Sequence, residues 1–448
     1  MQEHVEGIEE ALDEETHKEF DRRVREQADF LGDEARRGVL DNERFTIGLE
    51  LEGYVIGSDH HLGEIPDSLL EESPFNPELG LHNFEINTSP TRFGPEGVRE
   101  QEKEVEKRFR MTRDSLGGKG LEPVLDAMWT LQRGESSVFL SEHEEMDGHI
   151  FPENMREVTR YHAIDNALRG VVGGEIEFEV PGASHVFPSI LFESMATSIQ
   201  PHLQIPDAED FPEYHNAAVR TMAPVLALST NSPFLPPDLY NDMEDPRQLV
   251  EDTFHELRIP IFEQAVNTGE GYEQKKVRVP RDIGGIDEMF ERVAEDRIYA
   301  PALKDEETGD YTGKFWEWNY KRMTFWRWVR PVVGGESVKG ACDEKSIRLE
   351  YRPLPTQPSL EDIVSLQVFV AGLLHGMVEH RHPVQELEWE VARDNFYSVV
   401  RNGMDAEITW IDGNGGRTSD MDSIFSDLFR YAEKGLEERG LDGDRIDE

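Results

Sequence analysis

The chain has 448 residues, enough for one large domain or two, and its 37% apolar residues exclude a disordered acidic chain. It has 93 Asp and Glu against 46 Lys and Arg, a formal net charge of -47, which argues against nucleic acid and anionic membranes as partners because both attract basic patches. We therefore expect a folded protein adapted to high salt, where screening makes a large net charge tolerable.

The sequence also indicates a cytoplasmic protein. No apolar run approaches the length of a transmembrane helix, and the acidic start from Met1 to Glu6 is unlike a signal peptide. Cys342 is the only cysteine, which excludes an internal disulfide and a thiolate metal cluster. It lies in a stretch rich in glycine and charge, and we assign it no role.

Residues 3–39 are charged, with a sparse apolar stripe that includes Phe20 and Val24 and indicates one or two surface helices. We interpret residues 1–40 as a helical N-terminal extension in front of a main domain that spans 41–448. These helices are candidates for a homodimer contact.

The stretch from Phe45 to Ile56 predicts a β-strand, because it is rich in branched and aromatic residues and ends at a turn-like Gly57. Side chains alternate along a strand, so Glu50 and Glu52 would share one face. Neighbouring carboxylates repel each other unless a proton or a cation lies between them, and Mg2+ prefers oxygen ligands. The alternative is a solvated strand face, which is common in an acidic protein.

Three later segments, 81–88, 198–206 and 347–353, repeat this alternation of polar and apolar residues. The polar side chains that would share a face within each segment are Glu85 and Asn87, then Gln200, His202 and Gln204, and finally Arg348, Glu350 and Arg352. Pro201 lacks a backbone N–H, which favours an edge or irregular strand for the second of the three segments.

Helical patterns separate and follow these strands. They cover 95–116, 152–169, 212–229, 359–379 and the C-terminal end. The weakly patterned stretch 266–315 is interpreted as an insertion or a mobile loop. The alternation predicts an α+β fold, with a mainly antiparallel β-sheet that has one polar active-site face and helices packed on the other side.

The polar face combines carboxylates, an imidazole and arginines. Carboxylates and imidazole can hold two or more Mg2+ ions, and arginine grips phosphate with two hydrogen bonds. This inventory favours phosphoryl transfer, in which the protein positions groups and neutralises charge. No Walker loop is present, and Gly117 to Gly120 is interpreted as a turn. The aromatic residues between Phe315 and Trp328 are typical of packing rather than of an adenine shelf.

In these motifs the sequence resembles the glutamate–cysteine ligase-like carboxylate–amine ligases, which have a glutamine-synthetase-like catalytic fold. The matching segments are Gly48–Glu52, Phe84–Pro90, Gln200–Asp207, Ala227–Phe234, Trp328–Pro331 and Arg348–Arg352. The resemblance runs from about residue 45 to 440, so 41–448 would be the catalytic domain. Each motif alone is weak, but their order along the chain is specific.

The resemblance implies an enzyme that uses ATP and Mg2+. Members of this family activate the γ-carboxylate of glutamate as an acyl phosphate, and an amine then displaces the phosphate to form an amide. Cysteine is the amine in the type enzymes and is the first candidate here. The implied substrates are therefore two amino acids.

The resemblance also assigns roles to individual residues. Glu50, Glu52, Glu85, His202 and Glu350 would bind metal, Glu350 and Arg352 would be catalytic, and Gln200, Arg258 and Arg330 would bind the cofactor or a substrate carboxylate.

Two residues depart from the family pattern: Gln200 replaces a histidine and Gln204 replaces a glycine. These departures keep a catalytically silent relative that binds nucleotide or amino acid as an alternative, although the four glutamates and Arg352 argue against it. A guanidino-type phosphotransferase of the same fold is the other alternative. It would release no free phosphate.

Overall fold

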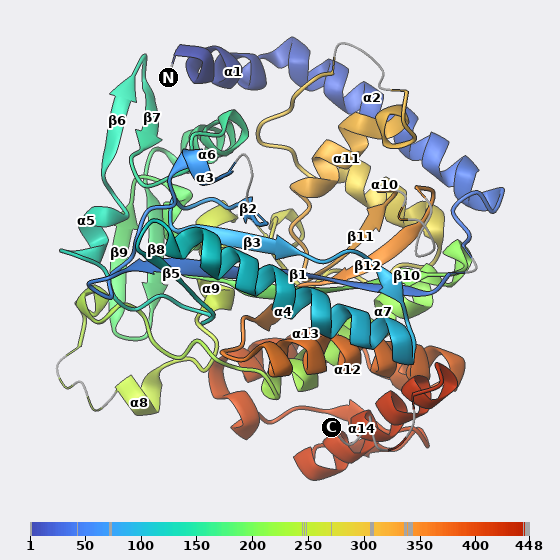
Figure 1. Ribbon diagram of the computed structural model, residues 1–448. Helices are drawn as coiled ribbons and strands as arrows, with labels where there is room; N and C mark the ends of the chain where they lie inside the picture. Colours follow the sequence, from blue (N-terminus) through green and yellow to red (C-terminus); the bar gives the residue numbers. More distant parts are fainter. Residues whose placement is uncertain are drawn as a thin grey trace.

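The computed structural model describes residues 2–42, 44–70, 74–243, 245, 247, 249–269, 271–304, 309–335, 338, 344–441 and 443. Within these residues, nine strands form one antiparallel sheet, with the central order β11-β12-β10-β1-β3-β2 (Figure 1). Its strands are β1 (Thr46–Gly57), β2 (Asn76–Pro77), β3 (Asn83–Asn87), β4 (Thr91–Arg92), β5 (Leu121–Val124), β10 (Ser198–Ile205), β11 (Val329–Val333), β12 (Ile347–Tyr351) and β13 (Leu354–Pro355).

Three small hairpins lie outside this sheet. They pair β6 (His143–Met146) with β7 (His149–Pro152), β8 (Ile176–Val180) with β9 (Ala183–Phe187), and β14 (Trp410–Ile411) with β15 (Arg417–Thr418). The α-helices are α1 (Gln2–Leu12), α2 (Glu14–Arg36), α3 (Asp67–Leu70), α4 (Pro95–Gly117), α5 (Ser136–Phe139), α6 (Thr159–Val172), α7 (Phe211–Ala227), α8 (Leu249–Asp252), α9 (Arg258–Val266), α10 (Ile286–Glu295), α11 (Trp316–Met323), α12 (Leu360–Glu379), α13 (Trp389–Asn402) and α14 (Met421–Glu438).

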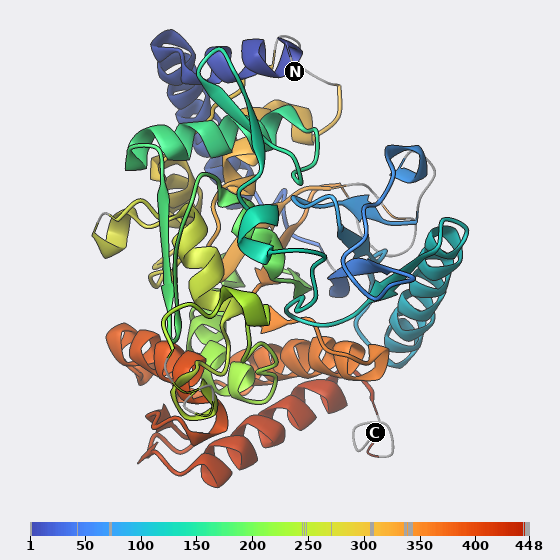
Figure 2. The ribbon, with the colours of Figure 1, turned by 90° about the vertical axis from the view of Figure 1, so that its left-hand side faces the viewer.

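The apolar face of the central sheet forms one side of the hydrophobic core. Leu49, Ile86, Leu203 and Leu349 are almost fully buried, and β10, β11 and β12 contact α7 or α12. In Figure 1, α12, α13 and α14 lie below the sheet, whereas α1, α2, α6 and α11 lie above it. Figure 2 shows the same layers from the side, with α1 and α14 at opposite ends. The predicted α+β class with a mainly antiparallel sheet is confirmed.

The four predicted strands of the polar face are β1, β3, β10 and β12, each within a few residues of its expected bounds. The predicted helices at 95–116, 212–229 and 359–379 are α4, α7 and α12. The helix predicted over 152–169 begins later, at Thr159, because His149–Pro152 instead pairs with β6.

Of the two alternatives for Pro201, the edge strand is wrong, because β10 lies between β12 and β1. The irregularity is present, but in the segment that pairs with β10. His202 pairs with Glu350, and Ile199 pairs with Leu354. Between these two pairs, β10 covers three residues (202 − 199), whereas the segment of β12 and β13 opposite it covers four (354 − 350). The extra residue is a β-bulge, which leaves one residue of the partner unpaired. Pro201 lies opposite this break in the ladder, where its missing N–H costs no hydrogen bond.

The N-terminal helices pack on the rest of the chain. Phe20, Val24 and Leu31 of α2 are fully buried, and α2 contacts α10 and α11. Asp13 caps α2 by accepting a hydrogen bond from the backbone N–H of Thr16 at 2.9 Å. Residues 1–40 as an extension and 41–448 as a catalytic domain stay predictions.

The described part of 266–315 contains α10, whose Met289, Phe290 and Val293 are buried. That this stretch is an insertion or a mobile loop stays a prediction. The expectation that no apolar run approaches the length of a transmembrane helix is wrong for α12, which is long and apolar enough by composition. However, 61% of its apolar window is buried inside the protein, which is also typical of a core helix.

We expect Phe20→Ala to lower the free energy of unfolding by about 3 to 5 kcal/mol, because it opens a cavity between α2 and the main core. Phe234→Ala is the control, since that side chain is 41% exposed. Urea unfolding in high KCl measures both variants. Equal, small effects would show that α2 is peripheral to the stability of the main core.

Candidate active site

Strand register gathers the predicted residues on the polar face of the sheet. Glu52 of β1 is paired with Glu85 of β3, and Glu50 with Gln200 of β10. One step further, His202 is paired with Glu350 of β12 and Glu350 with Arg330 of β11. Five neighbouring strands thus contribute side chains to one site.

Glu50, His202 and Glu350 form the tightest group. One ligand atom of each lies within 4.8 Å of the others, and His202 Nε2 is 3.2 Å from Glu50 Oε1. Such a separation suits side chains that share a metal ion. Arg348 Nε donates to His202 Nδ1 at 3.2 Å, so the proton of a neutral ring is on Nε2. A metal ion can bind His202 Nε2 only if the proton moves from Nε2 to Nδ1. Metal binding there therefore requires Arg348 to release Nδ1.

Glu350 is held by arginines. Its Oε2 accepts from Arg330 Nε at 2.8 Å and its Oε1 from Arg352 Nη1 at 2.5 Å, and Arg322 Nη1 lies 3.8 Å from Oε2. Burial raises the pKa of Glu350, but the charges of Arg330 and Arg352 outweigh burial and hold it well below its ordinary value. Glu350 is therefore a carboxylate anion at neutral pH.

Gln200, the departure from the family histidine, connects two predicted site residues. Its Nε2 donates to Glu52 Oε1 at 2.7 Å, and its Oε1 accepts from Arg352. Glu52 also accepts from the backbone N–H of Ser198 at 2.7 Å. An amide donates and accepts at the same time, so Gln200 maintains the order of the site.

Gln204, the second departure from the family pattern, uses its side-chain amide for hydrogen bonds to other residues of the chain. It is buried, donates to the backbone oxygen of Arg44 at 2.6 Å and accepts from Thr46 Oγ1 at 2.9 Å. These bonds attach β10 to the start of β1.

Two further carboxylates, which the sequence reasoning missed, belong to the cluster. Glu78 follows β2 and is hydrogen-bonded to Glu85, and Glu193 lies in the 3-10 helix Ile190–Met195 beside Glu52. They carry no alternating pattern in the sequence, and only the tertiary structure brings them to the sheet. The sequence contained no signal that could have found them.

Burial, and then the crowding of like charges, strongly raises the pKa values of these carboxylates. Burial, and then the charges of Glu52 and Glu50, raise the pKa of Glu78 to about 8. Burial, and then the charges of Glu52 and Glu78, raise the pKa of Glu193 to about 8 as well. Burial and the charges of Glu50 and Glu78 raise the pKa of Glu85 well above its ordinary value. Protons thus take the place of a missing positive charge, which is the electrostatic signature of a site that fits cations.

Arg258 lies close to Glu52 and Arg352 of this site. It is buried, donates from Nη2 to the backbone oxygen of Pro353 and contacts Glu256 Oε1 at 3.3 Å. It therefore supports the bulged segment that carries Arg352, and its contact with a substrate carboxylate stays a prediction.

The aromatic residues of 315–328 include Phe315, Trp318 and Trp328, which are almost fully buried. The prediction of packing residues is confirmed for these three, whereas Trp316 and Trp326 are only partly buried and their role stays a prediction. Cys342 lies outside the described residues.

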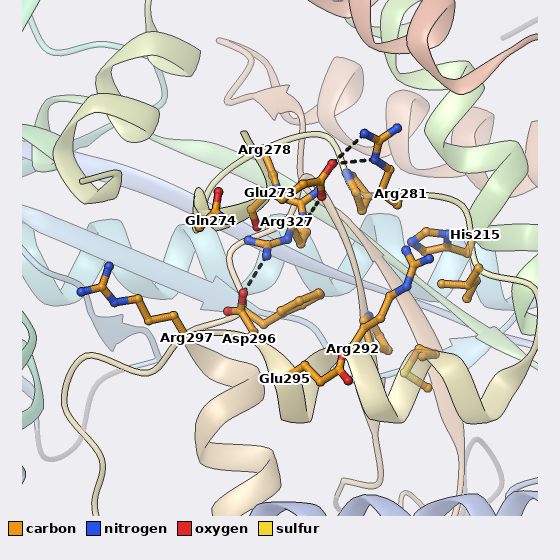
Figure 3. A pocket seen from close by; sticks show the side chains of 15 residues that line it. His215, Glu273, Gln274, Arg278, Arg281, Arg292, Glu295, Asp296, Arg297 and Arg327 are labelled. Carbon is orange, nitrogen blue, oxygen red and sulfur yellow. Dashed lines mark hydrogen bonds and ion pairs between the residues drawn. The ribbon is translucent and has the colours of Figure 1, made fainter. Parts of the chain in front are cut away.

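A separate cavity of about 460 Å³ lies beyond β11 on the side of α7 and α10, where Pro331 and His215 line it. Five arginines line it as well: Arg278, Arg281, Arg292, Arg297 and Arg327. Figure 3 shows Arg281 directed to Glu273 and Arg327 to Asp296, at 2.6 and 2.7 Å. This cavity contains none of the carboxylates of the polar face.

Comparison with known proteins identifies the family. The profile of glutamate-cysteine ligase family 2 matches residues 33–435. The chain therefore belongs to this family, and the resemblance seen in the motifs is confirmed.

One solved structure shares the fold at low sequence identity, and a second similar structure is also found. A bifunctional glutathione synthetase from Pasteurella multocida is 13% identical with a TM-score of 0.50, and the match covers 94% of this chain. This chain spans 48% of that protein's length. A glutamate–cysteine ligase from Francisella tularensis, solved in complex with AMP, is 12% identical with a TM-score of 0.47, and covers 91% of this chain and 81% of its own. No curated protein sequence matches the chain.

The raised pKa values make a prediction about stability. Glu78 and Glu193 have a pKa of about 8 in the folded chain, above the ordinary 4.5, so the folded state binds more protons than the unfolded state between these values. Stability of the metal-free protein should therefore fall as pH rises through about 8, by up to about 1.4 kcal/mol per pH unit for each proton.

We expect Glu78→Gln to lose part of this slope between about pH 5 and 8, the interval between the unfolded and folded pKa values, whereas the exposed control Glu64→Gln keeps it. Urea unfolding at constant KCl, with chelator present, measures the profiles. Identical slopes in the parent and Glu78→Gln would contradict the assigned titration.

Proposed function

We propose that this protein is an ATP- and Mg2+-dependent carboxylate–amine ligase that activates the γ-carboxylate of glutamate and joins it to an amine, with cysteine as the first candidate. The observation that carries the proposal is the crowding of Glu50, Glu52, Glu85 and Glu350 on one sheet face, bordered by arginines. Membership of glutamate-cysteine ligase family 2 supports the same chemistry. In this proposal the enzyme works in a salt-adapted cytoplasm.

Carboxylates without an arginine partner would hold the metal ions. Glu50 and Glu85 lack an arginine bond among the described contacts, and Glu85 is instead bound to Asn87 at 2.7 Å. These carboxylates would hold Mg2+, whose charge would offset the negative charge of ATP phosphates during transfer. Glu350 would share this role, since its position beside Glu50 and His202 places it between the acidic and the arginine-rich parts of the site.

The arginines would hold the anion that forms. Arg322, Arg330 and Arg352 converge on Glu350, so three positive charges face one carboxylate there. Burial, and then the charge of Arg330, lower the pKa of Arg322 to about 9, which shows that its positive charge is poorly compensated. A transferring phosphate or an acyl phosphate would supply the missing negative charge.

Gln200 would fix the position of the metal-binding carboxylates relative to the phosphate-binding arginines. It links Glu52 to Arg352, so the group that holds the metal and the group that contacts phosphate stay in register. This contact favours an active enzyme over a silent relative, because the substitution preserves hydrogen bonding at the centre of the site.

The test is phosphate release from ATP and Mg2+ in high KCl, with glutamate and each amino acid in turn, cysteine first. The ligase predicts release that needs both glutamate and one acceptor, with a γ-glutamyl product by mass. Nucleotide binding without release by any pair would favour the silent relative. Transfer of phosphate to a guanidine, without free phosphate, would favour the phosphotransferase.

We expect Glu350→Gln to lower kcat by about 100-fold or more, because it removes a metal-facing carboxylate and leaves Arg330 and Arg352 without their partner. The exposed Glu386→Gln is the matched control and should keep parental activity. The initial rate of phosphate release and the far-UV circular dichroism spectrum are measured together. A folded Glu350→Gln variant with parental kcat would remove Glu350 from the mechanism.

A further inference from the structure

A second cluster of metal-binding side chains lies between the N-terminal helix and the main body. It consists of His4 on α1, Glu157 just before α6, and His162 on the first turns of α6, and one ligand atom of each lies within 4.8 Å of the others. His4 Nε2 is 3.0 Å from Glu157 Oε2, and His162 Nε2 is 3.9 Å from the same oxygen. Ligands around a tetrahedral zinc ion lie about 3.4 Å apart, so these separations fit one ion.

The nitrogens of His162 have no hydrogen-bond partner among the described residues. The ring is fully buried. An unsatisfied buried ring costs free energy, and such a group calls for a specific explanation. A neutral imidazole has one nitrogen with a lone pair, which can be offered to a metal ion.

The surroundings orient the other histidine. His4 Nδ1 is 2.7 Å from Thr159 Oγ1, which leaves Nε2 directed at Glu157. Metal-bound histidines commonly use the second nitrogen in this way. A Cβ on Gly7 would lie 2.5 Å from Thr159 Cγ2, so glycine at this position lets α1 approach α6 closely.

We propose that His4, Glu157 and His162 bind a divalent transition metal of the Zn2+ class that fastens α1 to α6. Two imidazoles and one carboxylate select such an ion over Mg2+ and Ca2+, which prefer oxygen ligands. Water would complete the tetrahedron, because the three protein ligands leave one position open.

The site would also stabilise a segment that borders the active site. Arg160 and Tyr161, the two residues before His162, interact electrostatically with Glu78. In Figure 1, α6 lies between α1 and the sheet. A metal ion bound to His4, Glu157 and His162 would therefore fix the first turn of α6, which contains Arg160 and positions it near Glu78.

The test is a titration of the metal-free full chain with Co2+, then Zn2+, in high KCl with excess Mg2+ to occupy the sheet-face carboxylates. Tetrahedral Co2+ absorbs visible light far more strongly than Co2+ bound to surface carboxylates. We expect one strongly absorbing Co2+ per chain, displaced by Zn2+. His4→Gln and Glu157→Gln should each weaken it by at least about 10-fold.

His17→Gln on α2 and the exposed Glu153→Gln are the matched controls and should bind as the parent does. Both test variants change side chains at the edge of the fold, and circular dichroism confirms folding. Zn2+ should also raise the Tm of the parent but not of His4→Gln. Equal spectra and affinities in the parent and His4→Gln, or only weak carboxylate-type absorption, would overturn the proposal.

Discussion

Repulsion between carboxylates on one face of a β-sheet is the constraint on which the site depends. Glu50 and Glu52 belong to the central strand, and register places Glu85 and Glu350 on the strands around it. Such a face is stable only if protons, arginines or cations balance the charge. At Glu350 the balance comes from Arg330 and Arg352, whereas at Glu78, Glu85 and Glu193 it comes from protons.

Charge neutralisation by protons and charge neutralisation by arginines occur in two different parts of the polar face. Near β3 and the loop that contains Glu78, negative charge is in excess, and metal ions would replace protons there. Near β11 and β12, three arginines surround one carboxylate, and an additional anion fits. A metal-bound phosphate has both signs of charge, so it complements both parts at once.

The sequence predicted those features that repeat every two residues. Alternation placed Glu50, Glu52, Glu85, His202 and Glu350 on strands, and antiparallel pairing then brought them together. It could not predict Glu78 or Glu193, because their position depends on loops folding over the sheet. It also misjudged Pro201, since the bulge that accommodates a proline lies in the partner segment at Arg352 and Pro353 rather than in β10 itself.

A similar limit applies to the N-terminal helices. Their apolar stripe indicated helices, and the structure adds that Phe20 is buried against the main body and that His4 meets a histidine 158 positions away (162 − 4). Contacts of this kind have no local signature, because the partner of each side chain is set by packing between distant elements.

The most direct test of the account is a crystal structure with Mn2+ and a non-hydrolysable ATP analogue, in which anomalous scattering locates the metal. The account predicts anomalous peaks on the polar face, with one bridging the carboxylates of Glu50 and Glu350, and the analogue's phosphates in contact with Arg330 or Arg352. Nucleotide in the arginine-lined cavity beside His215, with no metal at the sheet-face glutamates, would contradict it.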